Sequence, residues 1–368
     1  MNALHAVVVG VTLAGLVPLP AGAQSDAQSD AEREVVEQTR DQVPSPPWPD
    51  GDQRGMGNTI GAGTWARCAQ HMTAEGAQSY ELSHERSNTM PMSPFGTALE
   101  YEHHPTVGIP GTLHAWNGEH VVQGEPGAQG TQINALGHFA YLPEPWNGED
   151  DFSADKAEYY GGYTQSDVKP EPGSPLQKLG MEQAPPIVTS AVLLDAKQHV
   201  GGGEALKAGQ LVTAADVEAM VEAQGLGWRG ILPGDALYVY TGWGENWQDP
   251  ANGSKYYSMG PGLSHDAAKL LEEKGVVLVA LDNPFTDPVT DGQLTGEAPP
   301  PEGTPDGLPF VVHHENLTQA GIYNIQNAKL DELAADTVWT SCTIVLPLRS
   351  RGASGSPVRP IAIGAPHE

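Results

Sequence analysis

The chain has 368 residues and a formal net charge of −28, with 18 lysines and arginines against 46 aspartates and glutamates. This length can form one large domain or two small ones, each with its own hydrophobic core. A charge this negative repels the phosphates of nucleic acids and of anionic lipids, so it argues against a nucleic-acid or membrane partner and for a solvated acidic surface.

The N-terminal segment indicates export. Residues Val7 to Leu19 form an apolar run that is too short to span a bilayer, and the small residues of Pro20-Ala21-Gly22-Ala23 follow it as a cleavage site would. We therefore expect residues 1–23 to be a signal peptide and the mature protein to be periplasmic or secreted. No other run approaches the length of a membrane span.

The rest of the chain is expected to have two parts. Residues 24–57 are rich in Asp, Glu, Gln, Ser and Pro and have too little apolar content to pack a core, which predicts a flexible acidic leader. Residues 58–368 are expected to form one folded domain with its own core.

Helices and strands are predicted to alternate in this domain. Apolar periodicity predicts a short helix around Trp65–Ala69, and two later helices begin at the N-cap candidates Thr213 and Ser264. Runs of β-branched and apolar residues predict buried strands at Ile187–Leu194, Ala236–Tyr240 and Val276–Leu281. The order strand, helix, strand indicates an α/β fold.

Cys68 and Cys342 are the only cysteines of the chain. An exported compartment would allow them to pair. However, Cys342 lies in a predicted buried strand, Ser341–Leu346, where a free cysteine behaves as a small hydrophobic residue. Because the sequence does not place the two Cα atoms within bridging distance, two unpaired cysteines are the favoured expectation.

One segment, Gly130-Thr131-Gln132-Ile133-Asn134-Ala135-Leu136-Gly137-His138-Phe139, resembles the metal-binding signature of the cyclase family. This family includes kynurenine formamidase, isatin hydrolase and some polyketide cyclases, and its signature reads His-x-Gly-Thr-His-x-Asp-x-Pro-x-His. In the family, the first two histidines and the aspartate bind zinc or manganese, and the last histidine assists catalysis. These four positions hold Ala128, Gln132, Asn134 and His138 here.

The resemblance extends over residues 78–363 and implies the fold of the family. Further similar blocks, in the family's order, are Tyr80–His84, Gly180–Leu194, Gly234–Ala236 with Thr241–Trp243, Asp282-Asn283 and Gly352–Pro357. The implied fold is an α/β domain of the swivelling β/β/α type, with a strongly curved mixed sheet and helices packed outside. The resemblance also implies a homo-oligomer, commonly a dimer.

The second half of the family's site is a late histidine followed about a dozen residues later by a glutamate. Either His313 or His314 can be the counterpart of that histidine, and Gln326 occupies the position of the glutamate. Residues Phe310–Glu315 are expected to form a strand, on which neighbouring side chains point to opposite faces, so at most one of the two histidines would face His138. Glu315 could replace a missing carboxylate if this strand bulges.

The substituted ligands leave two interpretations open. Gln132 and Asn134 offer neutral amide oxygens with low affinity for zinc, and Ala128 offers no ligand atom. The polar set Gln132, Asn134 and Gln326 could keep a binding role as an altered ligand shell, or the three amides could simply hydrogen-bond to one another. Zinc or manganese is implied by the resemblance, while the lost ligands are equally compatible with no metal.

Other candidate residues have a functional and a structural interpretation. Tyr160, Trp243, Asp282 and Asn283 are predicted to contact substrate, although tyrosine packing on the domain and an Asn-Pro turn explain two of them equally well. A cluster rich in His and Glu could form a relocated metal site, but its spacing favours solvated loops; it comprises Glu100, Glu102, His103, His104, His114 and His120.

The resemblance implies hydrolysis of an amide, formamide or lactone bond in a small cyclic or aromatic substrate. His138 would transfer protons, and His313 or His314 would bind metal or substrate. The alternative is an exported protein of the same fold that binds a small molecule without turnover, because every carboxylate ligand of the signature is missing.

Overall fold

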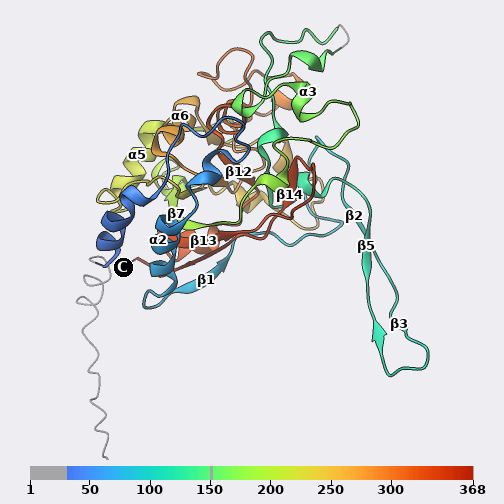
Figure 1. The fold of residues 1–368 in the computed structure, drawn as a ribbon, viewed down its shortest axis with the longest axis horizontal. Helices are drawn as coiled ribbons and strands as arrows, with labels where there is room; N and C mark the ends of the chain where they lie inside the picture. The colour runs from blue at the N-terminus through green and yellow to red at the C-terminus, as the bar shows by residue number, and fades with distance from the viewer. Residues whose placement is uncertain (1–30, 150–151, 368) are drawn as a thin grey trace, which may run out of the picture.

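A nine-stranded mixed sheet forms the centre of the protein (Figure 1). The computed structural model describes residues 31–149 and 152–367. The strand order is β1-β15-β13-β7-β9-β11-β12-β6-β14. The neighbours β7, β9, β11 and β12 run parallel, and the other pairings are antiparallel. The strands span Gln78–Glu81 (β1), Gln132–Asn134 (β6), Ile187–Asp195 (β7), Ala236–Tyr240 (β9), Leu278–Leu281 (β11), Tyr323–Gln326 (β12), Thr340–Val345 (β13), Gly355–Pro357 (β14) and Ile361–Gly364 (β15).

Two helices of ten residues begin where the sequence predicts them. Thr213 caps α5 (Ala214–Ala223) and exchanges hydrogen bonds with Asp216 in a capping box, and the Ser264 side chain caps α6 (His265–Lys274). Gly275 ends α6 with a φ of 72°, a conformation that favours glycine. Other α-helices are α2 (Ala62–Met72), α3 (Gln165–Val168), α4 (Ala196–His199), α7 (Val311–His313) and α8 (Asp331–Ala335).

Helices cover both faces of the sheet, as an α/β fold requires. Helices α5 and α6 lie side by side, whereas α2 packs against β7 and β13 (Figure 1). Every residue of β9 and β11 is buried, the pattern of central parallel strands that are covered on both faces. The predicted α/β class, with a curved mixed sheet and outer helices, is confirmed. Among the described residues, none of the helices is both long and apolar enough to cross a bilayer.

The described part of the predicted flexible leader is folded, so that expectation is wrong for residues 31–57. Residues 31–39 are helical and continue into a 3-10 turn at Arg40–Gln42. Val36, Thr39 and Met56 are buried against the domain. The few apolar residues of this acidic segment therefore suffice to pack it, because they lie on the face that meets the sheet domain. The predicted signal peptide, residues 1–23, lies outside the described residues.

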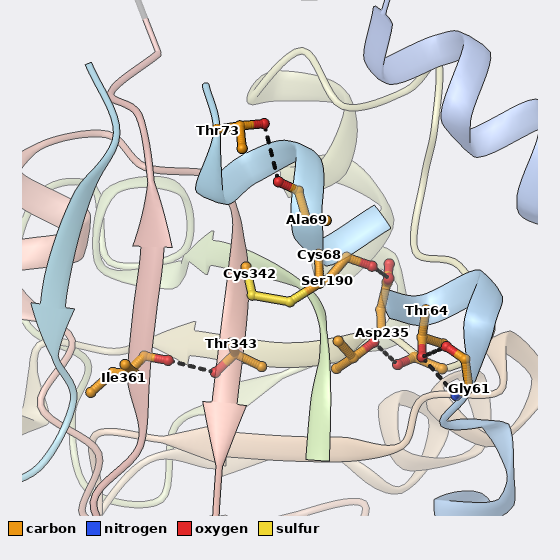
Figure 2. Close-up of a disulfide and its surroundings, with 12 residues drawn as sticks. Gly61, Thr64, Cys68, Ala69, Thr73, Ser190, Asp235, Cys342, Thr343 and Ile361 are labelled. Carbon is orange, nitrogen blue, oxygen red and sulfur yellow. Dashed lines mark hydrogen bonds between the residues drawn. A yellow bond between two sulfur atoms is a disulfide. The ribbon is translucent and has the colours of Figure 1, made fainter. Parts of the chain in front are cut away.

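A disulfide joins Cys68 in α2 to Cys342 in β13, contrary to the expectation of two free thiols (Figure 2). The Cα atoms are 4.2 Å apart because α2 lies directly on β13. The two residues are 274 positions apart in the chain, so only the fold brings them together.

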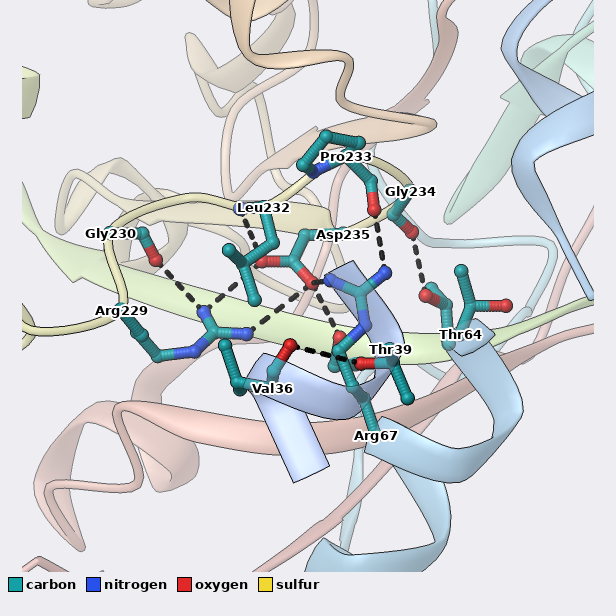
Figure 3. Close-up of polar contacts among 12 residues, drawn as sticks. Val36, Thr39, Thr64, Arg67, Arg229, Gly230, Leu232, Pro233, Gly234 and Asp235 are labelled. Atoms are coloured by element: carbon teal, nitrogen blue, oxygen red, sulfur yellow. Dashed lines mark hydrogen bonds and ion pairs between the residues drawn. The ribbon is translucent and has the colours of Figure 1, made fainter. Parts of the chain in front are cut away.

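A buried ionic group lies beside this disulfide (Figure 2), and Figure 3 shows its polar contacts. The Asp235 carboxylate is 3.4 Å from the Arg67 guanidinium and 3.1 Å from that of Arg229, and it also accepts hydrogen bonds from the Ser190 hydroxyl and the Leu232 amide. We call Asp235, Arg67, Arg229 and Ser190 the ionic cluster. Glu32, in the N-terminal helix, lies 3.8 Å from Arg229 and adds a second acidic group.

A two-stranded ribbon leaves the domain and projects away from it (Figure 1). It consists of β2 (Glu100–His103), β3 (Val107–Gly108), β4 (Ala115–Trp116) and β5 (Glu119–Gln123), with β2 paired to β5 and β3 to β4. Nearly all of its residues are exposed. The short strands β8 (Leu211–Val212) and β10 (Gly262–Leu263) form a separate parallel pair.

Candidate functional site

A cavity of about 600 Å³ opens at the β6–β12 end of the sheet. Its lining includes the amide and imidazole residues Gln132, His138, His313 and Gln326 and the aromatic residues Phe95, Tyr257 and Phe285. Two further segments line it, residues 124–128, which include the acidic residue Glu125, and residues 352–355. A small molecule with an apolar ring and a few polar atoms suits this mixture of aromatic and amide groups.

The pairing of β6 with β12 brings the amides of the signature together. Gln132 lies directly opposite Gln326 in the antiparallel register, and the Gln132 amide donates to Oε1 of Gln326 over 2.9 Å. Asn134 follows Gln132 by two residues and therefore points to the same face of the strand. The structure thus brings together the three amides that the sequence singles out.

His313 joins this group from a helix, and not from the strand expected for Phe310–Glu315. The apolar residues before it form the short helix α7, which continues into a π-helix over His314–Ala320. The His313 Nδ1–H donates to the buried carboxylate of Asp287, so Nε2 is free to accept. It accepts from the Gln326 amide at 2.8 Å, and the Asn134 amide nitrogen lies 3.3 Å away. We call Gln132, Asn134, Gln326 and His313 the amide cluster.

The sequence analysis did not identify Asp287, which contacts His313, or the aromatic lining residues Phe95, Tyr257 and Phe285. Asp287 lies in the loop after β11 and fixes the tautomer of His313 from a position 26 residues earlier in the chain. The only local signal is that polar residues follow a buried strand, which is common at the ends of strands in α/β proteins.

His314 and Glu315 point away from the cavity. The His314 ring stacks edge-on against Tyr141, and its neighbour Glu315 pairs with His265 at 2.8 Å. A helix turns adjacent side chains by about 100°, so only His313 faces the amides. The assignment of His314 to the site and the replacement of a lost carboxylate by Glu315 are both wrong.

His138 faces the amide cluster across the cavity. It ends the 3-10 turn Leu136–His138, and its ring centroid lies 6.3 Å from that of His313. Its side chain is exposed to the cavity, and it has no hydrogen-bond partner among the described residues. The surrounding protein disfavours the charged imidazole and lowers the pKa of His138, with a further contribution from His313. The imidazole is therefore neutral near pH 7 and able to accept a proton.

The amide cluster does not fit a zinc or manganese site. It offers one imidazole nitrogen and three neutral amides, and amide N–H groups already point at the Nε2 atom that a metal would need. Within residues 31–149 and 152–367, no three His, Cys, Asp or Glu side chains are grouped as a metal site would require. This finding also covers the histidines and glutamates of the exposed ribbon, where His120 contacts His104 at 3.2 Å.

Three of the four predicted substrate contacts serve packing. The Tyr160 hydroxyl donates to Asp52, the Trp243 indole donates to the Tyr256 carbonyl, and the Asn283 amide donates to the Pro261 carbonyl. None of the three lines the cavity. Each of these side chains has its hydrogen-bond partner inside the domain. They therefore do not contact a substrate in the cavity.

Asp282 is buried beside a smaller cavity of about 270 Å³. It accepts hydrogen bonds from the Thr241 amide and hydroxyl and from the Gly244 amide, at 2.6 to 3.1 Å. Burial raises the pKa of Asp282 to about 6, and these hydrogen bonds act in the opposite direction. Asp282 therefore braces the turn after β9 and does not face His138.

Comparisons with curated proteins identify relatives for part of the chain. Residues 80–288 match the family model described as Putative cyclase. The chain is 34% identical over 101 residues to a kynurenine formamidase from Bacillus cereus, and this match covers 27% of the chain and 39% of that relative. A kynurenine formamidase from Bacillus cytotoxicus is 33% identical over 110 residues, which are 30% of the chain and 43% of the relative. The chain thus matches less than half the length of these relatives.

Solved structures share the fold over most of the chain. A structure of a novel cyclase aligns with a TM-score of 0.68 and 24% identity, and it covers 86% of this chain and 97% of that chain. Isatin hydrolase A from Ralstonia solanacearum aligns with a TM-score of 0.50 and 19% identity, over 80% of this chain and 95% of that chain. The fold implied by the resemblance is therefore confirmed.

Proposed function

The chain belongs to the cyclase family, and from this membership and the geometry of the cavity we propose that it hydrolyses an amide, formamide or lactone bond of a small cyclic or aromatic substrate. One observation supports the reaction more than any other: a neutral imidazole, His138, is open to the cavity and faces the N–H groups of the amide cluster. A base and a set of hydrogen-bond donors are the two elements that hydrolysis of a carbonyl compound needs.

The amides replace the metal as the group that polarises the carbonyl. A carboxamide has two N–H donors, and Gln132 and Gln326 each use one of them within the cluster. Their second donors can bind the substrate carbonyl oxygen, while the aromatic wall holds the ring. His138 takes a proton from a water molecule that attacks the carbonyl carbon, and it then gives this proton to the leaving nitrogen or oxygen as the C–N or C–O bond breaks.

Export of the protein is part of this proposal. Disulfides persist in oxidising compartments and are rare in the cytosol, and the Cys68–Cys342 disulfide supports export for that reason. The substrate would then be a molecule that is present outside the cytoplasm.

The test is hydrolysis of three substrate types, an aryl formamide, a cyclic aryl amide and an aryl lactone, by protein treated with a chelator. Turnover should persist after chelation and should fall by about 100-fold or more in His138→Gln, because a positioned base contributes roughly this factor. The control is His314→Gln, which changes a nearby histidine outside the cavity and should leave the rate unchanged. Turnover that appears only when zinc or manganese is added would contradict the proposal.

A second candidate function, binding without turnover, is favoured by the hydrogen bonds that the amides make with one another and with His313. These contacts join the side chains at the positions of the metal ligands into one hydrogen-bonded network, in which only Gln132 Oε1 and Asn134 Oδ1 lack a partner among the described residues. The same assay separates the two functions. Tight binding of a substrate by calorimetry with no product would establish the binding protein, and product formation that depends on His138 would establish the enzyme.

A further inference from the structure

A second, smaller cavity lies at the carboxyl ends of the parallel strands. Its volume is about 270 Å³, and its wall includes Tyr240, the last residue of β9, and Asp282, which directly follows β11. Residues 328–331, shortly after β12, line it as well. Ligands of open α/β sheets commonly bind outside the carboxyl ends of the strands. Among the described residues, none lines both this cavity and the cavity of His138, so the two are separate.

Asp282 is a buried carboxylate in the wall of this second cavity. Its side chain is 1% exposed, and it accepts from the Thr241 amide and hydroxyl and from the Gly244 amide, which are all neutral donors. No lysine or arginine of the described residues forms an ion pair with it. Asp235, by contrast, contacts two guanidinium groups. Because a buried carboxylate is costly unless a cation offsets its charge, a cationic ligand in the cavity would supply the partner that Asp282 lacks within the chain.

Two stacked rings form an aromatic part of the wall. The His84 imidazole lies nearly parallel to the Trp247 indole, with ring centroids 4.2 Å apart and an interplanar angle of 11°. Burial lowers the pKa of His84 to about 4, so the ring is neutral near pH 7 and does not repel a cation. Its Nε2 atom is buried and has no hydrogen-bond partner in the part of the chain that the structure describes. An indole attracts cations more strongly than any other aromatic side chain, so this wall suits an organic cation.

The other charged side chains of the wall add negative charge. Among the described residues that line the cavity, three are acidic, Asp282, Glu245 and Asp331, and one is a lysine, Lys329. Glu245 pairs with Lys197, and Asp331 lies 3.2 Å from Lys329. This excess of carboxylates attracts a cation and repels an anion. The volume is slightly below the range of about 300–1,000 Å³ that holds drug-sized molecules, so the ligand is small.

We propose that this cavity binds a small organic cation, an ammonium group on a flat apolar body. The ammonium group donates to the Asp282 carboxylate, and the apolar body packs on the indole of Trp247. An inorganic cation would make no apolar contact with this wall, and an anion would meet three carboxylates. The site is separate from the cavity of His138, so the proposal goes beyond the hydrolytic function and does not depend on it.

The first test is calorimetric binding of benzylammonium, with benzyl alcohol and benzoate as the neutral and anionic controls of the same shape. Benzylammonium should bind at least about 10-fold more tightly than benzyl alcohol, because a hydrogen bond to a charged group contributes this factor or more. Benzoate should not bind. Failure of benzylammonium to bind at millimolar concentration, or binding of benzyl alcohol with equal affinity, would overturn the proposal.

The second test places the cation. Asp282→Asn should weaken the binding of benzylammonium by about 10- to 100-fold, because the ligand loses its charged acceptor. Glu125→Gln is the matched control, because it removes a carboxylate from the lining of the other cavity, and it should leave the affinity unchanged. The reverse result would place the cation beside His138 and contradict the assignment to this site.

A third variant keeps the proposal testable if Asp282→Asn does not fold. Lys329→Met removes positive charge from the wall and releases Asp331 from its ion pair, so the affinity for benzylammonium should rise by roughly 2- to 5-fold. Lys269→Met removes the same charge from an exposed position on α6 and should have no effect. An unchanged or lower affinity in Lys329→Met would count against the site.

Discussion

The ionic cluster around Asp235 and the amide cluster around Gln132 are both buried and polar, but they differ in charge and in access to solvent. The ionic cluster is closed: its carboxylate accepts from two guanidinium groups, a hydroxyl and a backbone amide (Figure 3). The amide cluster contains no carboxylate and no guanidinium group, and it opens on one side to the cavity. A buried carboxylate needs charged partners, whereas neutral amides can leave hydrogen-bonding atoms unused for a ligand.

The difference assigns a role to each cluster. The ionic cluster lies next to the disulfide and under the N-terminal helix, so it holds three distant segments of the chain together (Figure 2, Figure 3). The amide cluster lies across the cavity from a neutral imidazole and joins two sheet strands to a helix. The first cluster should therefore control the stability of the fold, and the second should control what the cavity binds.

The most severe way to break the ionic cluster is Asp235→Asn. This change leaves the guanidinium groups of Arg67 and Arg229 buried without their carboxylate, and loss of one partner of a buried ion pair costs about 3–5 kcal/mol of unfolding free energy. Urea unfolding at neutral pH measures the loss. The surface substitution Asp331→Asn, which removes an exposed pair with Lys329, should cost less than about 1 kcal/mol. Equal losses in the two variants would show that the ionic cluster does not hold the fold.

Acid should destabilise the fold through His71, whose pKa is influenced by Arg67 and Arg229 of the ionic cluster. Burial lowers the pKa of His71 to about 3, and the charges of Arg229, His367 and Arg67 contribute. His71 has a pKa near 6.5 in the unfolded chain, so between about pH 6.5 and pH 3 the unfolded chain binds more protons than the folded protein. The free energy of unfolding therefore falls as the pH falls through this range. The loss attributable to His71 by pH 3 should be up to about 4 kcal/mol.

The measurement is urea unfolding at a series of pH values for the wild type, His71→Leu and Gln132→Leu. His71→Leu should flatten the dependence of stability on pH. Gln132→Leu should keep the wild-type slope, because Gln132 does not titrate and its side chain donates to another amide, that of Gln326. A change of slope in Gln132→Leu, or no change in His71→Leu, would contradict this assignment.

Removal of the disulfide should have a smaller effect. A cross-link that closes a loop of 274 residues stabilises mainly by restricting the unfolded chain, typically by about 2–4 kcal/mol. Cys68→Ala with Cys342→Ala should lower the urea midpoint accordingly, and a reducing agent should lower the midpoint of the wild type but not that of the variant. Hydrolysis or ligand binding should be unchanged below the midpoint, because the disulfide is remote from the cavity lining.

Much of the fold can be predicted from local sequence. The strand Ala236–Tyr240 and the helices after Thr213 and Ser264 appear as expected, because apolar runs and N-caps act over a few residues. The helix at His313 was predicted as a strand, since the short apolar run before it has no periodicity that separates the two. The disulfide and the packing of residues 31–57 depend on partners more than a hundred residues away, which local patterns do not contain.

The site could be predicted to the extent that it follows strand geometry. The spacing of Gln132 and Asn134, and the antiparallel partner Gln326, place the amides together as the resemblance implies. Asp287 could not be found in this way, because it reaches His313 from a loop. Tyr160 and Trp243 were wrongly predicted to contact substrate, because the sequence does not show which way a side chain points. Both make their hydrogen bonds inside the domain.

Restoring the signature is the most direct way to turn the amide cluster into an ionic one. Gln132→His, Asn134→Asp, Gln326→Glu and Ala128→His together return every substituted ligand. Gln132 lies opposite Gln326 and shares a strand face with Asn134, while Ala128 lines the same cavity, so the four new ligands should converge. Affinity for zinc, measured by competition with a chromophoric chelator, should rise by at least about 100-fold over the wild type.

The single variant Ala128→His is the control and should bind zinc weakly, because one added imidazole does not complete a site. A quadruple variant that folds but gains no affinity would mean that β6 is not in the register of the signature, or that its partners lie elsewhere than β12. A gain in affinity would show that the scaffold still has the shape of a metal centre and that the amides alone keep the metal out. The two clusters would then differ only in their side chains, because the fold could accommodate buried charged groups both around Asp235 and around Gln132.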